Sequence, residues 1–197
     1  MHIVDKKEFR NAVKRFSKME DTRDEIWYRA ELLLKKGYDL DAYLLILTTW
    51  NFARFRYALI DFDLGGFEKL LKHLNPVFRK LRKQRFETAD LDSLSKDIAQ
   101  IYDSLANVGG VEYTGATKIM ALKNSGLFVM WDVAIRKMYN KELVRGEKIP
   151  QQPTGQDYVR FLKYSRSKFQ NIKTGGKFRC LAKVIDEYNY VKAKKYR

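Results

Sequence analysis

The sequence contains little cysteine, histidine or proline, and each scarcity excludes a class of protein. Among 197 residues there are one cysteine, two histidines and three prolines. The single Cys180 permits neither an internal disulfide nor a cysteine-ligated cluster. His2 and His73 are too few for a zinc site unless carboxylates assist them, so we expect no catalytic metal. No apolar run reaches the roughly 18 residues that a spanning helix needs, and the first residues show no secretory signal. These absences predict a cytoplasmic protein with no membrane segment.

Charge is what the sequence has in excess. Lys and Arg total 39 against 24 acidic residues, which gives a formal net charge of +15 at pH 7. An excess of this size favours a polyanionic partner. Nucleic acid is the first candidate and an anionic membrane surface is the second.

The apolar pattern is helical almost throughout, because alternating β-branched runs are rare. It predicts an all-α fold in one domain, residues 1–197, with two helical lobes around a cleft. The central lobe would span about 38–139, and the second lobe would combine about 1–37 with about 140–197. Segment 140–156 contains two glycines and two prolines and is the longest predicted loop.

Several local signals predict where helices begin and end. Thr22 and Glu25 form a capping-box pattern, and Asp39 can cap the next helix, an apolar one over 40–59. The pair at 75–76, Asn-Pro, predicts a further helix start, and Asp92 or Ser93 would cap the one over 94–107. Gly175 and Gly176 precede a last helix that ends in the basic C-terminal residues.

A glycine-rich turn separates two helices in the middle of the chain. Residues 94–107 form the first helix, 108–111 the turn, and the second helix begins at about Tyr113, so the whole motif occupies about 93–123. The glycines allow a sharp turn, and the unbonded N–H groups at the start of the second helix can donate to a phosphate oxygen. The alternative is an ordinary helical hairpin with glycine at its corner.

The stretch VGGVEYTGATKIMALKNSGLFVMWDVAIRK, residues 108–137, resembles the helix-hairpin-helix DNA glycosylases, which include MutY, endonuclease III and the archaeal 8-oxoguanine and alkylbase enzymes. In that family a Leu-Pro-Gly-Val-Gly hairpin precedes a Thr-Ala pair, a helix and an Asp at the start of the next helix. Gly110 and Val111 match the turn, Ala116 the pair and Asp132 the catalytic Asp. The sequence departs from the pattern at Asn107 for Pro, Glu112 for the second Gly and Gly115 for Thr.

The resemblance implies base-excision chemistry on double-stranded DNA that carries a damaged, deaminated or mispaired base. A fixed carboxylate at Asp132 would stabilise the positive charge that develops on the sugar, or orient the attacking water. The alternative role for Asp132 is the N-cap of the helix that follows, and both roles are compatible.

A lysine decides whether such an enzyme also cuts the strand, because its amine attacks the sugar. Family members with this lyase activity carry that lysine where this sequence has Thr114, so we expect a monofunctional glycosylase. Lys118, one helical turn further, keeps the bifunctional alternative open, although a phosphate contact or a solvated position fits it better.

The remaining expectations concern binding. The base pocket would use Trp50, Asn51 and Phe52 first and Tyr43 and Trp131 next, although core packing is the alternative for each aromatic residue. The following residues are expected to contact DNA: Val108, Gly109, Gly110, Val111, Tyr113, Thr114, Lys118, Arg136 and Lys137. The resemblance also allows a monovalent cation at the carbonyls near Val108 and Gly110, and it implies a monomer associated with the nucleoid. A noncatalytic nucleic-acid-binding module is the competing interpretation.

Overall fold

The computed structural model describes residues 3–19, 22–173 and 180–196. Within these ranges the regular structure is ten α-helices and two short 3₁₀ helices, without a strand. The predicted all-α class is therefore confirmed. None of the helices in these ranges has both the length and the apolar character required to cross a membrane.

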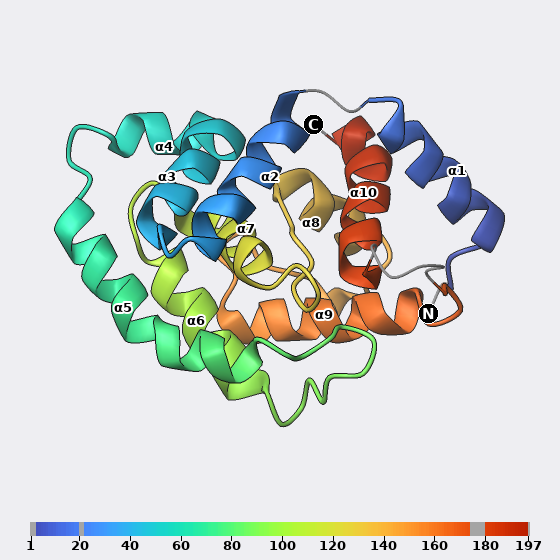
Figure 1. The fold of residues 1–197 in the computed structure, drawn as a ribbon. Coiled ribbons are helices and arrows are strands. Elements are labelled where there is room, and N and C mark those ends of the chain that lie inside the picture. The colour runs from blue at the N-terminus through green and yellow to red at the C-terminus, as the bar shows by residue number, and fades with distance from the viewer. Residues whose placement is uncertain (1–2, 20–21, 174–179, 197) are drawn as a thin grey trace.

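The helices follow one another with short connections over most of the chain (Figure 1). The α-helices are α1 (Lys6–Ser17), α2 (Thr22–Lys35), α3 (Asp39–Trp50), α4 (Phe52–Ala58), α5 (Leu64–Leu81), α6 (Ser95–Ala106), α7 (Glu112–Lys123), α8 (Val133–Asn140), α9 (Gly155–Lys168) and α10 (Leu181–Ala193). The 3₁₀ helices are η1 (Arg145–Glu147) and η2 (Lys194–Tyr196). The predicted loop over 140–156 is confirmed, because only η1 interrupts the connection between α8 and α9.

Packing links segments from both ends of the chain to its middle. Helix α10 packs between α1 and α8, and α9 packs along α6, as Figure 1 shows. Helix α2 packs against α3 and α7, although it belongs to the predicted second lobe. A single cluster of buried apolar residues extends through all of these contacts. The division into two lobes stays a prediction.

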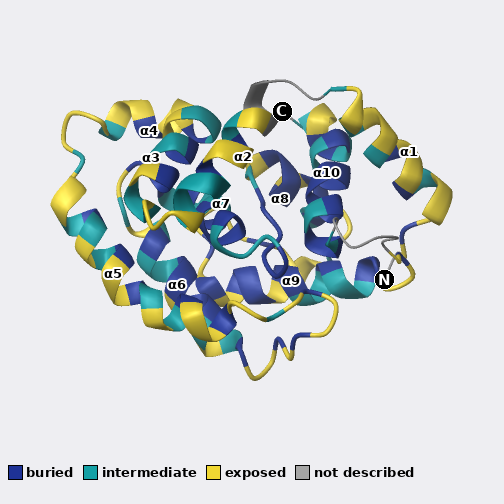
Figure 2. Ribbon diagram, viewed as in Figure 1, coloured by how far each residue is buried: buried dark blue, intermediate teal, exposed yellow. Residues whose placement is uncertain are grey.

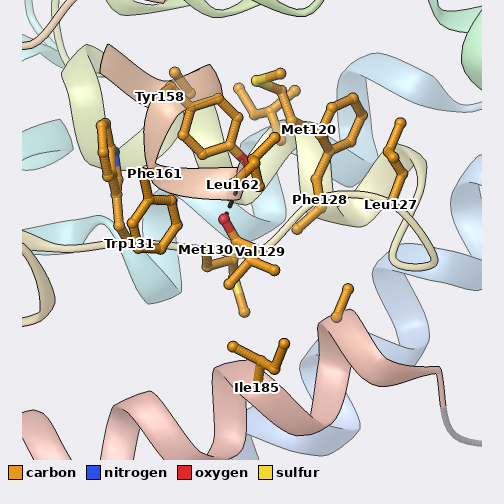
Figure 3. Packing of buried hydrophobic residues seen from close by; sticks show 14 of the residues in the cluster. Met120, Leu127, Phe128, Val129, Met130, Trp131, Tyr158, Phe161, Leu162 and Ile185 are labelled. Atoms are coloured by element: carbon orange, nitrogen blue, oxygen red, sulfur yellow. Dashed lines mark hydrogen bonds between the residues drawn. The ribbon is translucent and has the colours of Figure 1, made fainter. Parts of the chain in front are cut away.

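Aromatic side chains form the centre of the core. Trp131 is 1% exposed and makes edge or tilted contacts with Tyr102, Tyr158 and Phe161 at centroid distances of 5.0 to 5.8 Å (Figure 3). Figure 2 shows that α10 is almost entirely buried, whereas α5 alternates between a buried and an exposed face. Three packed rings therefore hold the Trp131 side chain in the core.

Three predicted helix boundaries need correction, and two more lie outside the described residues. Tyr38, not Asp39, is the N-cap of α3, and it makes no side-chain cap bond. Helix α5 begins at Leu64, where Asp63 accepts the Gly66 N–H, so the Asn-Pro pair at 75–76 lies inside the helix. A continuous apolar face along α5 outweighs the one backbone bond that Pro76 cannot make. Asp90, not Asp92 or Ser93, accepts the N–H groups before α6. The Thr22 side chain and Gly175–Gly176 lie outside the described residues.

The predicted helix over 40–59 is two helices. It breaks at Asn51, between α3 and α4, where φ and ψ are −118° and 15°. The break positions the buried Asn51 side chain against the turn before α7, as described below.

Candidate functional site

Helices α6 and α7 form a tight hairpin whose turn spans Asn107 to Val111. The Val108 carbonyl accepts hydrogen bonds from the N–H groups of Val111 and Glu112, both at 3.1 Å. Gly110 has φ +82°, a conformation that favours glycine. Glu112, the first residue of α7, also lies in the left-handed region with φ 51°. The turn thus uses two left-handed residues to reverse the chain.

Helix α4 packs directly on this turn. A Cβ atom added to Gly110 would lie 2.7 Å from the Ala58 Cβ and 3.1 Å from the Phe55 ring. Phe55 itself is 1% exposed, so it has no room to move away. Gly110 is therefore required both by its backbone conformation and by its contact with α4.

Asn51 joins the break between α3 and α4 to the same turn. Its Nδ2 donates to the carbonyls of Gly110 at 2.8 Å and Val111 at 3.1 Å. A side chain at Gly115 would meet this Nδ2 at 3.0 Å and Leu47 at 3.1 Å. Gly115 thus leaves space for the Asn51 amide, which holds the hairpin on its buried side.

The outer side of the hairpin offers main-chain donors. Within the described ranges, the N–H groups of Gly109, Tyr113 and Thr114 have no protein acceptor. Such groups at a helix start bind anions such as phosphate. The carbonyls predicted to hold a monovalent cation are already acceptors, at Val108 from the turn amides and at Gly110 from Asn51. A cation there stays a prediction.

A cavity of about 230 Å³ reaches α7 at Lys118, about two helical turns beyond Val111 at the end of the hairpin turn. Five helices and two connecting segments line it with the following residues: Phe16, Met19, Thr49, Trp50, Lys118, Met130, Trp131, Asp132, Ile135, Lys183, Asp186, Glu187 and Tyr190. Four of these, namely Trp50, Lys118, Trp131 and Asp132, are predicted site residues. The cavity therefore brings together the predicted carboxylate, the predicted lysine and two predicted aromatic residues.

The segment 129–132 brings Asp132 to the cavity, and a side chain from elsewhere in the fold holds each of its first three residues. The Tyr158 hydroxyl donates to the Val129 carbonyl at 2.9 Å, a bond drawn in Figure 3. The Asp186 carboxylate accepts the Met130 N–H at 2.6 Å. The Thr117 hydroxyl lies 3.2 Å from the Trp131 carbonyl and 3.3 Å from its nitrogen. The segment is thereby fixed before any ligand binds.

Asp132 is the N-cap of α8. Its side chain accepts the Ile135 N–H at 2.7 Å, and the residue is half-buried at the cavity wall. The capping role is confirmed, and it orients the carboxylate toward a fixed position. A carboxylate held in this way can stabilise a cation that forms beside it.

Lys118 also lines the cavity. Its Nζ donates to the Trp50 carbonyl at the end of α3. Thr114, one turn earlier on α7, is half-buried near the free amides of the hairpin. The geometry thus places an ammonium group in the cavity and no lysine at the hairpin position itself.

Helix α10 supplies the cavity residues that sequence reasoning missed. Lys183, Asp186, Glu187 and Tyr190 recur at helical spacing and line one side of the cavity. Asp186 is 7% and Glu187 2% exposed. Burial raises the pKa of the Asp186 carboxyl well above its ordinary value, and neighbouring Glu187 adds to the rise while Lys183 opposes it. The available signal was a stripe of charged residues inside an otherwise apolar helix.

Three of the residues predicted for the base pocket lie elsewhere. Tyr43 is 1% exposed in the core and Asn51 is bonded to the hairpin, and neither lines the cavity. Phe52 is 50% exposed on α4, where the Arg56 guanidinium lies 5.7 Å from its ring centroid. Trp131 belongs mainly to the core, so Trp50 is the predicted aromatic residue best placed to contact a ligand.

The residues predicted to contact DNA are also divided by burial. Gly109 and Lys137 are exposed, whereas Gly110 and Val111 are buried in the turn. Arg136 is 7% exposed, and its guanidinium donates to the carbonyls of Pro150 and Gln151. Burial lowers the pKa of this guanidinium. Arg136 therefore holds the loop after α8 and does not present a free charge to a phosphate.

The described residues contain no cluster of three or more His, Cys, Asp or Glu side chains suited to a metal ion. Comparisons of the chain with protein-family models, with curated proteins and with solved structures found no match. The functional proposal therefore depends on the geometry of this chain and on the resemblance of its hairpin.

Proposed function

We propose that the protein is a DNA glycosylase of the helix-hairpin-helix type, which flips a damaged, deaminated or mispaired base out of the duplex and hydrolyses its N-glycosidic bond. One observation carries the proposal: Asp132 follows a segment anchored at residues 129–131 and lies at the wall of a cavity that reaches α7 about two helical turns beyond a hairpin turn with free amides. Such an arrangement suits a reaction in which the duplex binds outside and one base enters the protein.

Two of the residues at which the hairpin departs from the family pattern are compatible with the same proposal. Glu112 stands where the pattern has a second glycine, and it adopts φ 51°, a conformation typical of glycine. Gly115 stands where the pattern has threonine, and Asn51 fills the adjacent space. Two of the substitutions are thus compatible with the backbone that the motif requires.

The hairpin would bind the DNA backbone without reading its sequence. The amides of Gly109, Tyr113 and Thr114 would contact phosphate, and the net charge of +15 would add affinity that salt weakens. On α4, the exposed Phe52 and the neighbouring Arg54 and Arg56 would contact the strand beside the flipped base. A monomer that works on nucleoid DNA in the cytoplasm fits this scheme.

Within the cavity, Asp132 would stabilise the oxocarbenium-like sugar or orient water. Trp50 would stack on the extruded base. Lys118 lines the cavity, where its Nζ donates to the Trp50 carbonyl, and its ammonium group would bind a phosphate or the sugar. With threonine at the hairpin position, water is the expected nucleophile.

The test is a single-turnover incubation with duplexes that carry uracil, hypoxanthine, thymine opposite guanine, 8-oxoguanine or an alkylated adenine. Each sample is divided and analysed with and without hot alkali. Strand breaks that require alkali support a monofunctional glycosylase and identify its base. Breaks without alkali would instead favour a lyase that uses Lys118. Salt-sensitive binding with no break on any duplex would favour the noncatalytic binding module.

Asp132→Asn tests the residue at the centre of the proposal. Because Asn caps a helix as well as Asp does, the variant should fold normally and bind DNA nearly unchanged. Base release should fall by about a hundredfold or more, since the cation would lose its counter-charge. Asp5→Asn is the matched control, because Asp5 caps α1 with the same chemistry and does not line the cavity. Normal turnover by Asp132→Asn would exclude the assigned role.

A further inference from the structure

A second carboxyl group shares the cavity with Asp132. Asp186 lines the cavity from α10, is 7% exposed, and accepts the Met130 N–H through Oδ1 at 2.6 Å. Met130 lies two residues before Asp132, so the two acids are attached to the same short segment. Their surroundings differ, because Asp132 is half-buried whereas Asp186 is enclosed.

The charges around Asp186 come from several elements. Burial is the main influence on its pKa and raises it well above the ordinary value, with Glu187 acting in the same direction and Lys183 against it. The other titratable groups that face it or share its cavity are Tyr158 on α9, Lys118 on α7, Asp132 before α8, Cys180 before α10 and Tyr190 on α10. Two carboxyl groups in one site with unequal environments are suited to opposite roles, one as acid and one as anion.

On the basis of the proposed glycosylase activity, we propose that Asp186 contacts the extruded base and donates a proton to it as the base leaves. The C1′–N bond breaks, and its electron pair departs with the base. The proton moves from the Asp186 carboxyl group to a ring nitrogen or exocyclic oxygen of the base, which leaves as a neutral molecule. The oxygen of water bonds to C1′, and the proton lost by that water restores the Asp186 carboxyl group through solvent.

This role predicts a substrate class. A neutral base is a poor leaving group until it accepts a proton, so its release depends on Asp186. A base that already carries a positive charge, such as 7-methylguanine, leaves as a neutral molecule without that proton. The cavity is therefore adapted to neutral lesions, and Asp132 alone is sufficient for cationic ones.

The experiment compares Asp186→Asn with wild type in single turnover. One duplex carries the neutral lesion that wild type releases fastest, and the other carries 7-methylguanine. Asn retains an oxygen that can accept the Met130 N–H, so the segment before Asp132 stays anchored. Asp157→Asn is the control, because Asp157 is also 7% exposed but does not line this cavity. Unfolding curves and DNA affinity of each variant check that it is folded.

Asp186→Asn should slow release of the neutral base by about a hundredfold or more and change 7-methylguanine release only a few-fold. In wild type the rate on the neutral base should fall as pH rises through the pKa of the acid, and the variant should lose that limb. The pH dependence of neutral-base release tests the role of Asp186 even if 7-methylguanine is not a substrate.

Three results would overturn the inference while the proposed glycosylase stands. In the first, Asp186→Asn releases the neutral base as fast as wild type does. In the second, Asp186→Asn loses the same factor on both duplexes and its rate still falls as pH rises. In the third, wild type releases only cationic bases. If wild type releases no base from any duplex, the proposed function itself fails, and the role of Asp186 fails with it.

Discussion

The hairpin and the cavity share one helix, α7, yet they present different kinds of chemical groups. The hairpin offers main-chain amides, and the α4 surface beside it offers exposed aromatic and arginine side chains. The cavity offers carboxyl and ammonium groups, of which Asp186 and Glu187 are buried and Asp132, Lys118 and Lys183 are half-buried. Backbone donors suit a partner whose sequence does not matter, whereas buried charges suit a single reacting group. A substitution in one region should therefore spare the function of the other, and the following changes test that separation.

Gly110→Ala should have the largest effect on stability, at about 2 to 5 kcal/mol. A residue with a β-carbon loses about 1 to 2 kcal/mol of stability in the left-handed conformation. Overpacking against Ala58 and Phe55 adds a similar or larger loss. Urea unfolding measures the loss. Gly109→Ala is the matched control, because nothing lies within 4 Å of a Cβ there, and it should change stability by less than about 0.5 kcal/mol. Equal losses in both variants would mean that the α4 contact does not define the turn.

Asn51→Ala should cost about 1 to 3 kcal/mol, because two buried carbonyls lose their donor. Asn51→Asp should cost more, since a carboxylate would face the same carbonyl oxygens. Denaturant midpoints give both values, and Asn107→Ala at an exposed position is the control. Base release per bound duplex should stay close to wild type in Asn51→Ala. A large loss of base release with normal stability would mean that the hairpin affects the chemistry of the cavity and that the two regions are not separate.

Asp186→Asn should change the pH dependence of stability. The unfolded chain ionises this carboxyl above about pH 3.9, whereas burial keeps its pKa well above that value in the folded protein. The folded state therefore loses up to about 1.4 kcal/mol per pH unit as pH rises from the unfolded pKa to the folded pKa. The variant lacks this loss, so its free energy of unfolding should rise relative to that of wild type as pH increases above about 4. If the unfolding free energies of wild type and variant instead differ by the same amount at every pH above about 4, burial does not raise the pKa of Asp186.

Glu112→Gly should have the smallest effect, a gain of about 0.5 kcal/mol. Relief of the left-handed backbone is worth about 1 to 2 kcal/mol, and the flexibility of glycine in the unfolded chain returns about half of it. The contact between Arg54 and Glu112, 3.7 Å long and largely exposed, contributes little. Differential scanning calorimetry can detect the shift. A clear loss of stability would mean that Glu112 has a role beyond filling a glycine position.

The sequence predicted the helical class and the positions of the helices on either side of the glycine turn, because both depend on local rules; the helix-hairpin-helix motif itself stays a prediction. The turn needs glycine, and the predicted start of α7 differs by one residue from the observed start at Glu112. Helix ends that depend on packing were harder to predict. Pro76 signals a helix start in isolation, but the buried face of α5 continues through it. The break at Asn51 was not predictable from periodicity, because its cause is a contact with residues 59 and 60 positions away.

The cavity residues on α10 could not be predicted from the sequence, because they too depend on contacts between distant parts of the chain. Asp132 and Lys118 could be found from spacing along a recognisable motif. Asp186 contacts Met130 across 56 residues, and no local pattern predicts that pairing. Arg136 was assigned to DNA by its charge, yet its guanidinium bonds to a loop that only the fold brings near. Long-range contacts thus decide which charged residues belong to the cavity.

Trp50 gives this protein an internal optical reporter. Trp50 is only partly buried and borders the cavity, Trp131 is 1% exposed and also lines it, and the Trp27 ring centroid lies 5.1 Å from that of Trp50. Entry of a base beside Trp50 would therefore alter the emission of the tryptophans around the cavity, with the largest change at Trp50. Occupancy of the cavity can therefore be followed in real time on the unlabelled protein, separately from binding of the duplex at the hairpin.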